Sequence, residues 1–150
     1  MDFITNLLEM DLEALVPALD SVLGLVRVVL TVLLLAGPIV MIALGALYIW
    51  FAPPEANYRF GFRTYFGMGS IEAWKYSQKI AGIAFGGLGV VLLIIMVVVV
   101  CGFGGMDAFQ MASTALTCLL WQAGTAMLAR LVVGILAAVY FNPDGTRRRE

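Results

Sequence analysis

Long uncharged apolar segments dominate the pattern of hydrophobic and polar positions along this chain. Residues 28–54 and 80–106 contain no charged side chain, and residues 108–129 are also uncharged. After Arg130 the apolar pattern continues through residues 131–141. Because a helix needs about 20 apolar residues to cross a hydrocarbon core about 30 Å thick, each of the three segments is predicted to span a membrane.

The chain is therefore predicted to be all-α, an integral membrane three-helix bundle that forms a single domain over residues 1–150. Its hydrophobic content of 62% exceeds the ~45–50% that is typical of soluble domains. We expect the spans at about residues 22–50, 80–101 and 111–141, and a motif-bearing loop at about residues 51–79.

The first 20 residues combine apolar and acidic side chains and predict a different element. Five of the ten acidic residues lie here, without any Lys or Arg. Phe3 and several leucines recur at roughly helical spacing, which is typical of an amphipathic helix in the membrane interface. We expect this N-terminal amphipathic interfacial helix at about residues 2–19, bent at Pro17. A frayed terminus with some interfacial contact is the alternative.

Sequence signals also mark where two of the spans begin. Ser70 is a typical N-cap residue, and Glu72 follows in the first turn, where a negative charge suits the helix dipole. The helix of the second span is therefore expected to begin at residue 71 and to emerge from the membrane at this end. Asp107 and Gln110 have the spacing of a capping box at the start of the third span.

Proline and glycine positions predict how the spans bend and pack. Pro38 lies near the middle of the first span and is expected to kink it, because proline removes a backbone donor. Gly82 and Gly86 form a small-xxx-small pair, with Gly87 and Gly89 beside them, and such residues let helices approach closely. Packing within the chain is favoured over a homodimer contact, although both roles fit the pattern.

The third span is the most polar, and Arg130 is the one charge expected to lie deep in it. An arginine at mid-bilayer is unfavourable by ~2.5 kcal/mol or more, so it should face the bundle or a wet crevice. Gln122, hydroxyl groups, carbonyls freed near Pro38 and a bound anion are candidate partners. Two roles remain open: an intramembrane anion site at Arg130 and Gln122, or a side chain that extends to the cytoplasmic headgroups.

The distribution of positive charge predicts the orientation. The loop and the C-terminal tail together hold seven of the nine basic residues: Arg59, Arg63, Lys75, Lys79, Arg147, Arg148 and Arg149. Because short cytoplasmic segments are enriched in Lys and Arg, we expect the loop and the C-terminus in the cytoplasm and the N-terminus outside.

The loop alternates basic groups with aromatic rings, so that Arg59 and Arg63 stand among Tyr58, Phe60, Phe62 and Tyr65. At an inner leaflet the arginines can bind phosphates while the rings insert at headgroup level. The alternative is a loop that only packs beneath the bundle.

These loop residues resemble the signature of the SdpI-type family, which consists of small bacterial membrane proteins. The matching pattern is Asn57-x-x-x-Gly61-x-Arg63-Thr64, then Ser70-x-Glu72-x-Trp74 and Gly82. The match covers about residues 57–82, and the spans agree with the family's three-helix module in layout. The best-known member has two such modules in tandem, whereas this chain has only the one that carries the motif.

The resemblance implies a location in the bacterial cytoplasmic membrane and a binding site in the loop. That site would comprise Asn57, Gly61, Arg63, Thr64, Glu72 and Trp74. Arg63 would bind an anionic headgroup or an acidic partner, and Glu72 could pair with Arg63 across the loop. Trp74 would fix the depth at which the helix enters the membrane, while Asn57 and Gly61 would shape the loop.

The family resemblance also implies a non-catalytic function, either immunity against a peptide toxin or sensing of membrane stress. The expected partners are membrane lipids, a toxin peptide, a cytoplasmic regulator or another membrane protein. The alternative is a small oligomeric transporter, or a transporter subunit, with its anion site at Arg130. A structural assembly factor is a third candidate.

The chain lacks the residues that several kinds of catalysis and metal binding require. The chain has no histidine, and its two cysteines lack chelating spacing. It contains neither a phosphate-binding loop nor a nucleophile elbow, and the spans hold no paired carboxylates. We therefore expect no enzymatic activity, no cofactor, no metal and no binding of nucleic acid.

Overall fold

Helices make up almost all regular structure of the chain. The computed structural model describes residues 2–56 and 59–148, with side chains at residue 17 and from residue 19 onward. The helices in chain order are α1 (Asp2–Trp50), the 3-10 helix η1 (Phe66–Met68), α2 (Ile71–Cys101), the 3-10 helix η2 (Gly102–Gly105) and α3 (Ala108–Tyr140). The predicted all-α class is confirmed, since the described residues add only an isolated bridge between Phe141 and Arg147.

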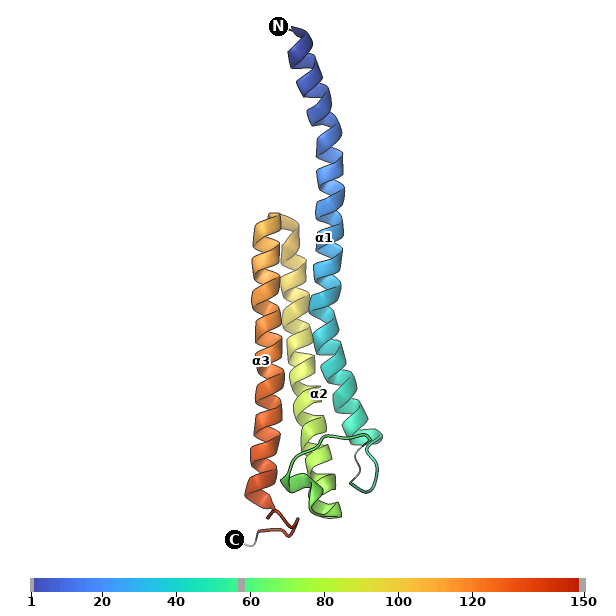
Figure 1. Ribbon diagram of the computed structural model, residues 1–150, viewed down its shortest axis with the longest axis vertical. Coiled ribbons are helices and arrows are strands. Elements are labelled where there is room, and N and C mark those ends of the chain that lie inside the picture. The colour runs from blue at the N-terminus through green and yellow to red at the C-terminus, as the bar shows by residue number, and fades with distance from the viewer. Residues whose placement is uncertain (1, 57–58, 149–150) are drawn as a thin grey trace.

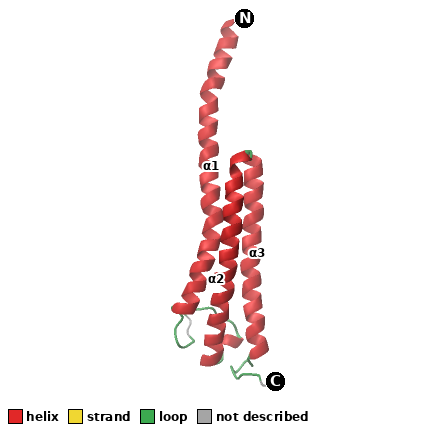
Figure 2. Cartoon of the chain, turned by 180° about the vertical axis from the view of Figure 1, so that it is seen from behind, coloured by secondary structure: helices red, strands yellow, loops and turns green. Residues whose placement is uncertain are grey.

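The three long helices form an elongated bundle in which α2 lies between α1 and α3, as views from opposite sides show (Figure 1 and Figure 2). α2 and α3 are antiparallel and meet at η2, which marks the far end of the bundle. The loop of residues 51–70 and the C-terminal residues 141–148 lie together at the opposite end, called the loop end. α1 extends well beyond η2, so the two termini lie at opposite ends of the molecule (Figure 1).

Three segments are long and apolar enough to cross a membrane by length and composition: Leu19–Trp50, Ile71–Gly105 and Ala108–Tyr140. Many of their large side chains are exposed on the outer surface of the bundle. Leu25, Val98 and Leu120, for example, are 64%, 68% and 66% exposed. Soluble proteins rarely expose contiguous apolar surface of this extent. The findings therefore support the predicted membrane protein with three spanning helices.

The N-terminal residues belong to the same helix as the first span. α1 is 49 residues long, continues through both Pro17 and Pro38, and curves gently along its length (Figure 1). Residues 2–19 are therefore helical, as expected. Their amphipathic, interfacial character stays a prediction, because the side chains before residue 17 lie outside the description.

The two predicted helix starts are confirmed. The Ser70 side chain accepts a hydrogen bond from the backbone N–H of Ala73 at 3.1 Å, and α2 begins at the next residue. At α3 the Asp107 carboxylate accepts from the Gln110 N–H at 2.8 Å, while the Gln110 side chain accepts from the Asp107 N–H at 3.3 Å. Both arrangements satisfy backbone donors that a helix end would otherwise leave without a partner.

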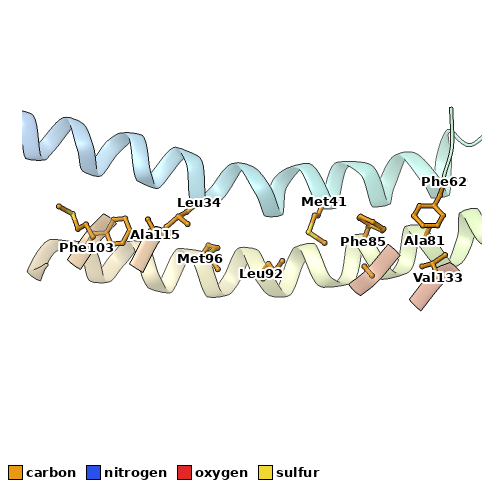
Figure 3. Packing of buried hydrophobic residues seen from close by; sticks show 12 residues of the cluster. Leu34, Met41, Phe62, Ala81, Phe85, Leu92, Met96, Phe103, Ala115 and Val133 are labelled. Atoms are coloured by element: carbon orange, nitrogen blue, oxygen red, sulfur yellow. The ribbon is translucent and has the colours of Figure 1, made fainter. Parts of the chain in front are cut away.

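One continuous apolar core runs between the helices (Figure 3). Its central members come from α1 and α2, and side chains of η2, α3 and the loop complete the two ends. The core members include Leu34, Met41, Phe62, Ala81, Phe85, Leu92, Met96, Phe103, Ala115 and Val133. Phe62 is the member that comes from the loop, so the core extends to the segment that carries the predicted site.

Glycines bring α1 and α2 into backbone contact along a seam formed by Gly45, Gly82, Gly86 and Gly89. A Cβ added at Gly45 would lie 2.5 Å from the backbone nitrogen of Gly86, and one at Gly89 would lie 2.9 Å from the backbone nitrogen of Ile42. The predicted role of the α2 glycines in packing within the chain is thus confirmed for three of them. Gly87 differs, because a Cβ there would meet nothing within 4 Å.

We predict that Gly45→Ala destabilises the bundle, because the new methyl group would press on the backbone of α2. Overpacking of this kind costs about 1–3 kcal/mol, which should lower the midpoint of thermal unfolding in detergent. Gly87→Ala is the matched control, since its methyl group enters open space and the change from glycine favours a helix by roughly 0.5–1 kcal/mol. Equal midpoints for the two variants would contradict the seam.

Candidate functional site

A buried glutamine on α2 fixes the centre of the loop. The Gln78 Nε2 group donates to the Phe62 carbonyl at 2.7 Å, and the Phe62 N–H donates to Gln78 Oε1 at 2.8 Å. Gln78 is 3% exposed and Phe62 is 4% exposed. A single amide side chain thus satisfies both backbone groups of Phe62, as a neighbouring strand would. Gln78 was not among the predicted site residues.

Trp74 and Gly61 hold the loop against the start of α2. Trp74 is fully buried, and its indole N–H donates to the Pro53 carbonyl at 2.8 Å. Gly61 has a φ of 120°, and a Cβ at this position would lie 2.6 Å from the Trp74 ring. Only glycine combines this backbone conformation with so close an approach. Gly61 therefore shapes the loop as predicted, while Trp74 lies beneath the loop and connects its two arms.

Thr64 shapes the next turn of the loop. Its hydroxyl oxygen accepts a hydrogen bond from the Gly67 N–H at 2.9 Å. Gly67 in turn lies against Ser77 of α2, with no space for a side chain between them. The Thr64 side chain thus acts on the conformation of its own loop.

The remaining predicted loop residues have different positions. Asn57 lies outside the described residues. Glu72 is exposed in the first turn of α2 and lines grooves that also contain Tyr140 and Arg147. Arg63 is exposed and lines a different groove, together with Arg130 of α3. Glu72 and Arg63 therefore belong to separate parts of the loop end.

Arg63 and Arg130 share an open groove of about 580 Å³ between α1, α3 and the loop, which we call the arginine groove. Apolar and aromatic residues form the rest of its surface. The complete lining is Leu44, Tyr48, Gly61, Phe62, Arg63, Phe85, Ala126, Met127 and Arg130. The groove thus joins two cations that are far apart in the sequence to an apolar wall made by three helices.

Aromatic contacts position Arg130 in this groove. Its guanidinium carbon lies 6.0 Å from the centroid of the Phe62 ring, which is within the range of a cation–π contact. The Phe62 ring also packs edge-on against Tyr48, with ring centroids 5.8 Å apart, and at a tilt against Phe85, with centroids 5.9 Å apart. Since Gln78 fixes the Phe62 backbone, the loop and α3 are linked through Phe62.

The position of Arg130 along α3 explains how it reaches the loop. At 1.5 Å per residue, its backbone lies about 15 Å inside the end of α3 at Tyr140. Its side chain nevertheless meets Phe62 of the loop, because the loop packs Phe62 into the core at this end of the bundle. Arg130 thus lines a groove beside the loop, and the choice between an anion site and contact with the headgroups stays a prediction.

Gln122 binds a backbone carbonyl of α1, and its predicted part in an anion site stays a prediction. Its Nε2 group donates to the Leu34 carbonyl of α1 at 2.9 Å. Pro38 has no N–H, and in a helix that N–H would bind the Leu34 carbonyl. Gly37 makes room for the glutamine, because a Cβ at Gly37 would collide with Gln122 Oε1. Gln122 lies about 12 Å along α3 from Arg130 by helical rise, and it does not line the arginine groove.

A C-terminal hairpin closes the loop end, a feature that the sequence interpretation missed. The Gly145 N–H donates to the Asn142 carbonyl at 2.9 Å, and the Asn142 N–H donates to the Thr146 carbonyl at 2.9 Å. Asn142, Pro143 and Gly145 occupy the positions that a type I turn favours, so a local signal was available. The Ser70 hydroxyl donates to the Gly145 carbonyl at 2.7 Å, which ties the hairpin to the start of α2.

Asp144 stabilises the same turn. The hydrogen bond from the Thr146 hydroxyl, together with the one from the Thr146 N–H, lowers the pKa of the Asp144 carboxyl below its ordinary value. A group with a lowered pKa contributes stability at pH values above its unfolded pKa, and this contribution is lost as the pH falls through the folded pKa. At neutral pH the Asp144 carboxylate is therefore ionised and contributes its stabilising hydrogen bonds to the hairpin.

The described residues offer no cluster of three or more His, Cys, Asp or Glu side chains that could hold a metal ion. What the loop end offers instead is two arginines beside an apolar wall. Guanidinium groups bind phosphate and carboxylate through paired hydrogen bonds. The arrangement is suited to binding an anion with an apolar part.

We predict energetic coupling between Pro38 and Gln122. Gln122→Leu should destabilise the chain by about 1–3 kcal/mol, because it leaves the buried Leu34 carbonyl without a donor. In a Pro38→Ala background the N–H of residue 38 can bind that carbonyl, so the same substitution should cost clearly less. A double-mutant cycle of thermal unfolding in detergent measures the difference. Additive effects would contradict the assignment.

We also predict that Gln78→Leu releases the loop. The substitution keeps the side-chain volume but leaves the Phe62 N–H and carbonyl without partners, at a cost of about 1–3 kcal/mol for each buried group. Hydrogen exchange at residues 60–64 should accelerate, as should limited proteolysis there. Lys75→Met, at an exposed position of α2, is the control and should leave both rates unchanged.

No protein-family model, curated protein or solved structure matches this chain. The SdpI-type resemblance accordingly stays a prediction that rests on the residues of the loop.

Proposed function

We propose that this chain is a non-catalytic, SdpI-like protein of the bacterial cytoplasmic membrane that protects the cell against membrane-active peptides. It acts through the loop and the arginine groove at the cytoplasmic face. The observation that carries the proposal is the shared groove of Arg63 and Arg130. One of these arginines belongs to the family-like pattern, and the other is the charge within the third span.

The charge distribution supports a cytoplasmic position for the groove. The loop and the C-terminal hairpin lie at the same end of the bundle (Figure 1), and together with the start of α2 they carry most of the basic residues. Such segments are retained in the cytoplasm. The amino end of α1, which is acidic and lies beyond the far end, would then face the outside.

The rigid loop supports a binding role rather than a passive connection. Gln78 and Trp74 fix the loop backbone on both sides of Gly61 by buried hydrogen bonds. Arg63 follows directly after the fixed residue Phe62. A binding group on a preorganised backbone loses little conformational entropy when it meets its ligand.

The transporter alternative receives less support. Among the described residues the buried polar side chains are Ser77, Gln78 and Gln122, and the latter two bind backbone groups. The middle of the bundle is filled by apolar side chains such as Met41 and Leu92 (Figure 3). A polar path for an anion would therefore have to lie between copies of the chain.

We predict that expression of the chain raises the survival of a sensitive bacterial strain under membrane-active peptides, and that Arg63→Ala removes most of this gain. Loss of charge-assisted hydrogen bonds weakens binding by ~1.5–3 kcal/mol, so the protective effect should fall about tenfold or more. Survival curves over a series of peptide concentrations measure it.

Lys75→Ala is the matched control, because it removes an exposed positive charge of α2 that does not line the arginine groove. It should protect as well as the unmodified chain when membrane levels are equal. Equal killing with and without the protein would remove the immunity proposal.

A further inference from the structure

We infer that the arginine groove binds one anionic phospholipid of the leaflet at the loop end. Its phosphate lies between Arg63 and Arg130, and one acyl chain follows the apolar wall of the groove. This inference rests on the proposed function, because it concerns the same groove and the same face of the membrane.

Charge complementarity is the first argument. Arg63 and Arg130 come from the loop and from α3, and the residues that line the groove with them include no carboxylate. An anion in this groove would meet both guanidinium groups and would be attracted by each of them. Guanidinium is also the side-chain group best matched to phosphate, which it binds through paired hydrogen bonds.

The apolar wall selects a lipid over a free anion. Leu44 of α1, Phe85 of α2, and Ala126 and Met127 of α3 form this wall beside the arginines. An acyl chain gains no transfer free energy here, since it comes from surroundings that are equally apolar, and it binds by close packing. A small hydrated anion would meet the same two cations but would leave the wall unused.

The position of the groove along the spans corresponds to the level of the lipid headgroups. Trp50 is 75% exposed and lies on α1 just past Tyr48, which lines the groove. Tryptophan is enriched where the hydrocarbon core meets the headgroups. On α2 the last charged residue is Lys79, about 9 Å before Phe85 by helical rise. The arginines thus lie at the level of the phosphates, while the wall continues toward the hydrocarbon.

The environment of Arg130 also favours an anionic ligand. Arg130 is exposed on an apolar span, where a charge without a partner is unfavourable. Its guanidinium carbon lies 6.0 Å from the centroid of the Phe62 ring, and a guanidinium carries five N–H donors that can bind a phosphate. A lipid phosphate would neutralise the charge at the surface that faces the bilayer.

The experiment is native mass spectrometry of the full chain released from detergent, with phosphatidylglycerol or phosphatidylcholine titrated as the probe. We expect one phosphatidylglycerol to bind at least tenfold more tightly than phosphatidylcholine. The double variant Arg63→Gln/Arg130→Gln should lose this preference. Arg147→Gln/Arg148→Gln removes the same charge from the hairpin and should keep it.

A second variant tests the wall without changing the charge. Met127→Ala removes part of the wall at an exposed position and should weaken phosphatidylglycerol binding several-fold, with an unchanged melting temperature. Equal binding of the two lipids, or equal losses in both double variants, would overturn the inference. Displacement of the lipid by millimolar inorganic phosphate would assign the groove to a free anion and would overturn it as well.

The two proposals fail in different ways. If the chain binds phosphatidylglycerol selectively but gives no protection in cells, the lipid site stands and the immunity proposal falls. If the chain protects cells but shows no lipid preference, the inference about the lipid falls and the protective function stands.

Discussion

Every backbone polar group inside a bilayer needs a partner from the protein, because hydrocarbon offers none. Two buried glutamines meet this constraint where the helices themselves do not. Gln122 binds the Leu34 carbonyl that Pro38 leaves without a donor, and Gln78 binds both backbone groups of Phe62. The first contact allows a proline within a spanning helix. The second allows an irregular loop to pack into the end of the bundle.

Glycines, which have no side chain, are as important for the packing as these two amides. Gly45 and Gly86 bring the backbones of α1 and α2 together, Gly37 makes room for Gln122, and Gly61 makes room for Trp74. Each glycine thus permits one close contact. Arg63 and Arg130 share one groove although one belongs to an irregular segment and the other to a helix. Rigid packing around the groove, rather than any reactive group in the described residues, distinguishes this part of the molecule.

The sequence predicts those features that local patterns determine. Span lengths follow from uncharged runs, and the caps at Ser70 and Asp107 follow from the residues at fixed spacing around them. The partners of Gln78 and Gln122 could not be read in this way, because each amide binds a backbone group on a distant segment. The grouping of Arg63 with Arg130 needs the same three-dimensional information. The C-terminal hairpin could have been predicted, because its turn residues lie next to one another in the sequence. The arginines beside them were used only to predict the orientation in the membrane.

The bond between Gln122 and the Leu34 carbonyl restricts how the bundle can move. A slide of α3 along α1 by even one helical turn would separate the amide from the one carbonyl of α1 that lacks its own helical donor. The contact therefore fixes the register of α3 against α1.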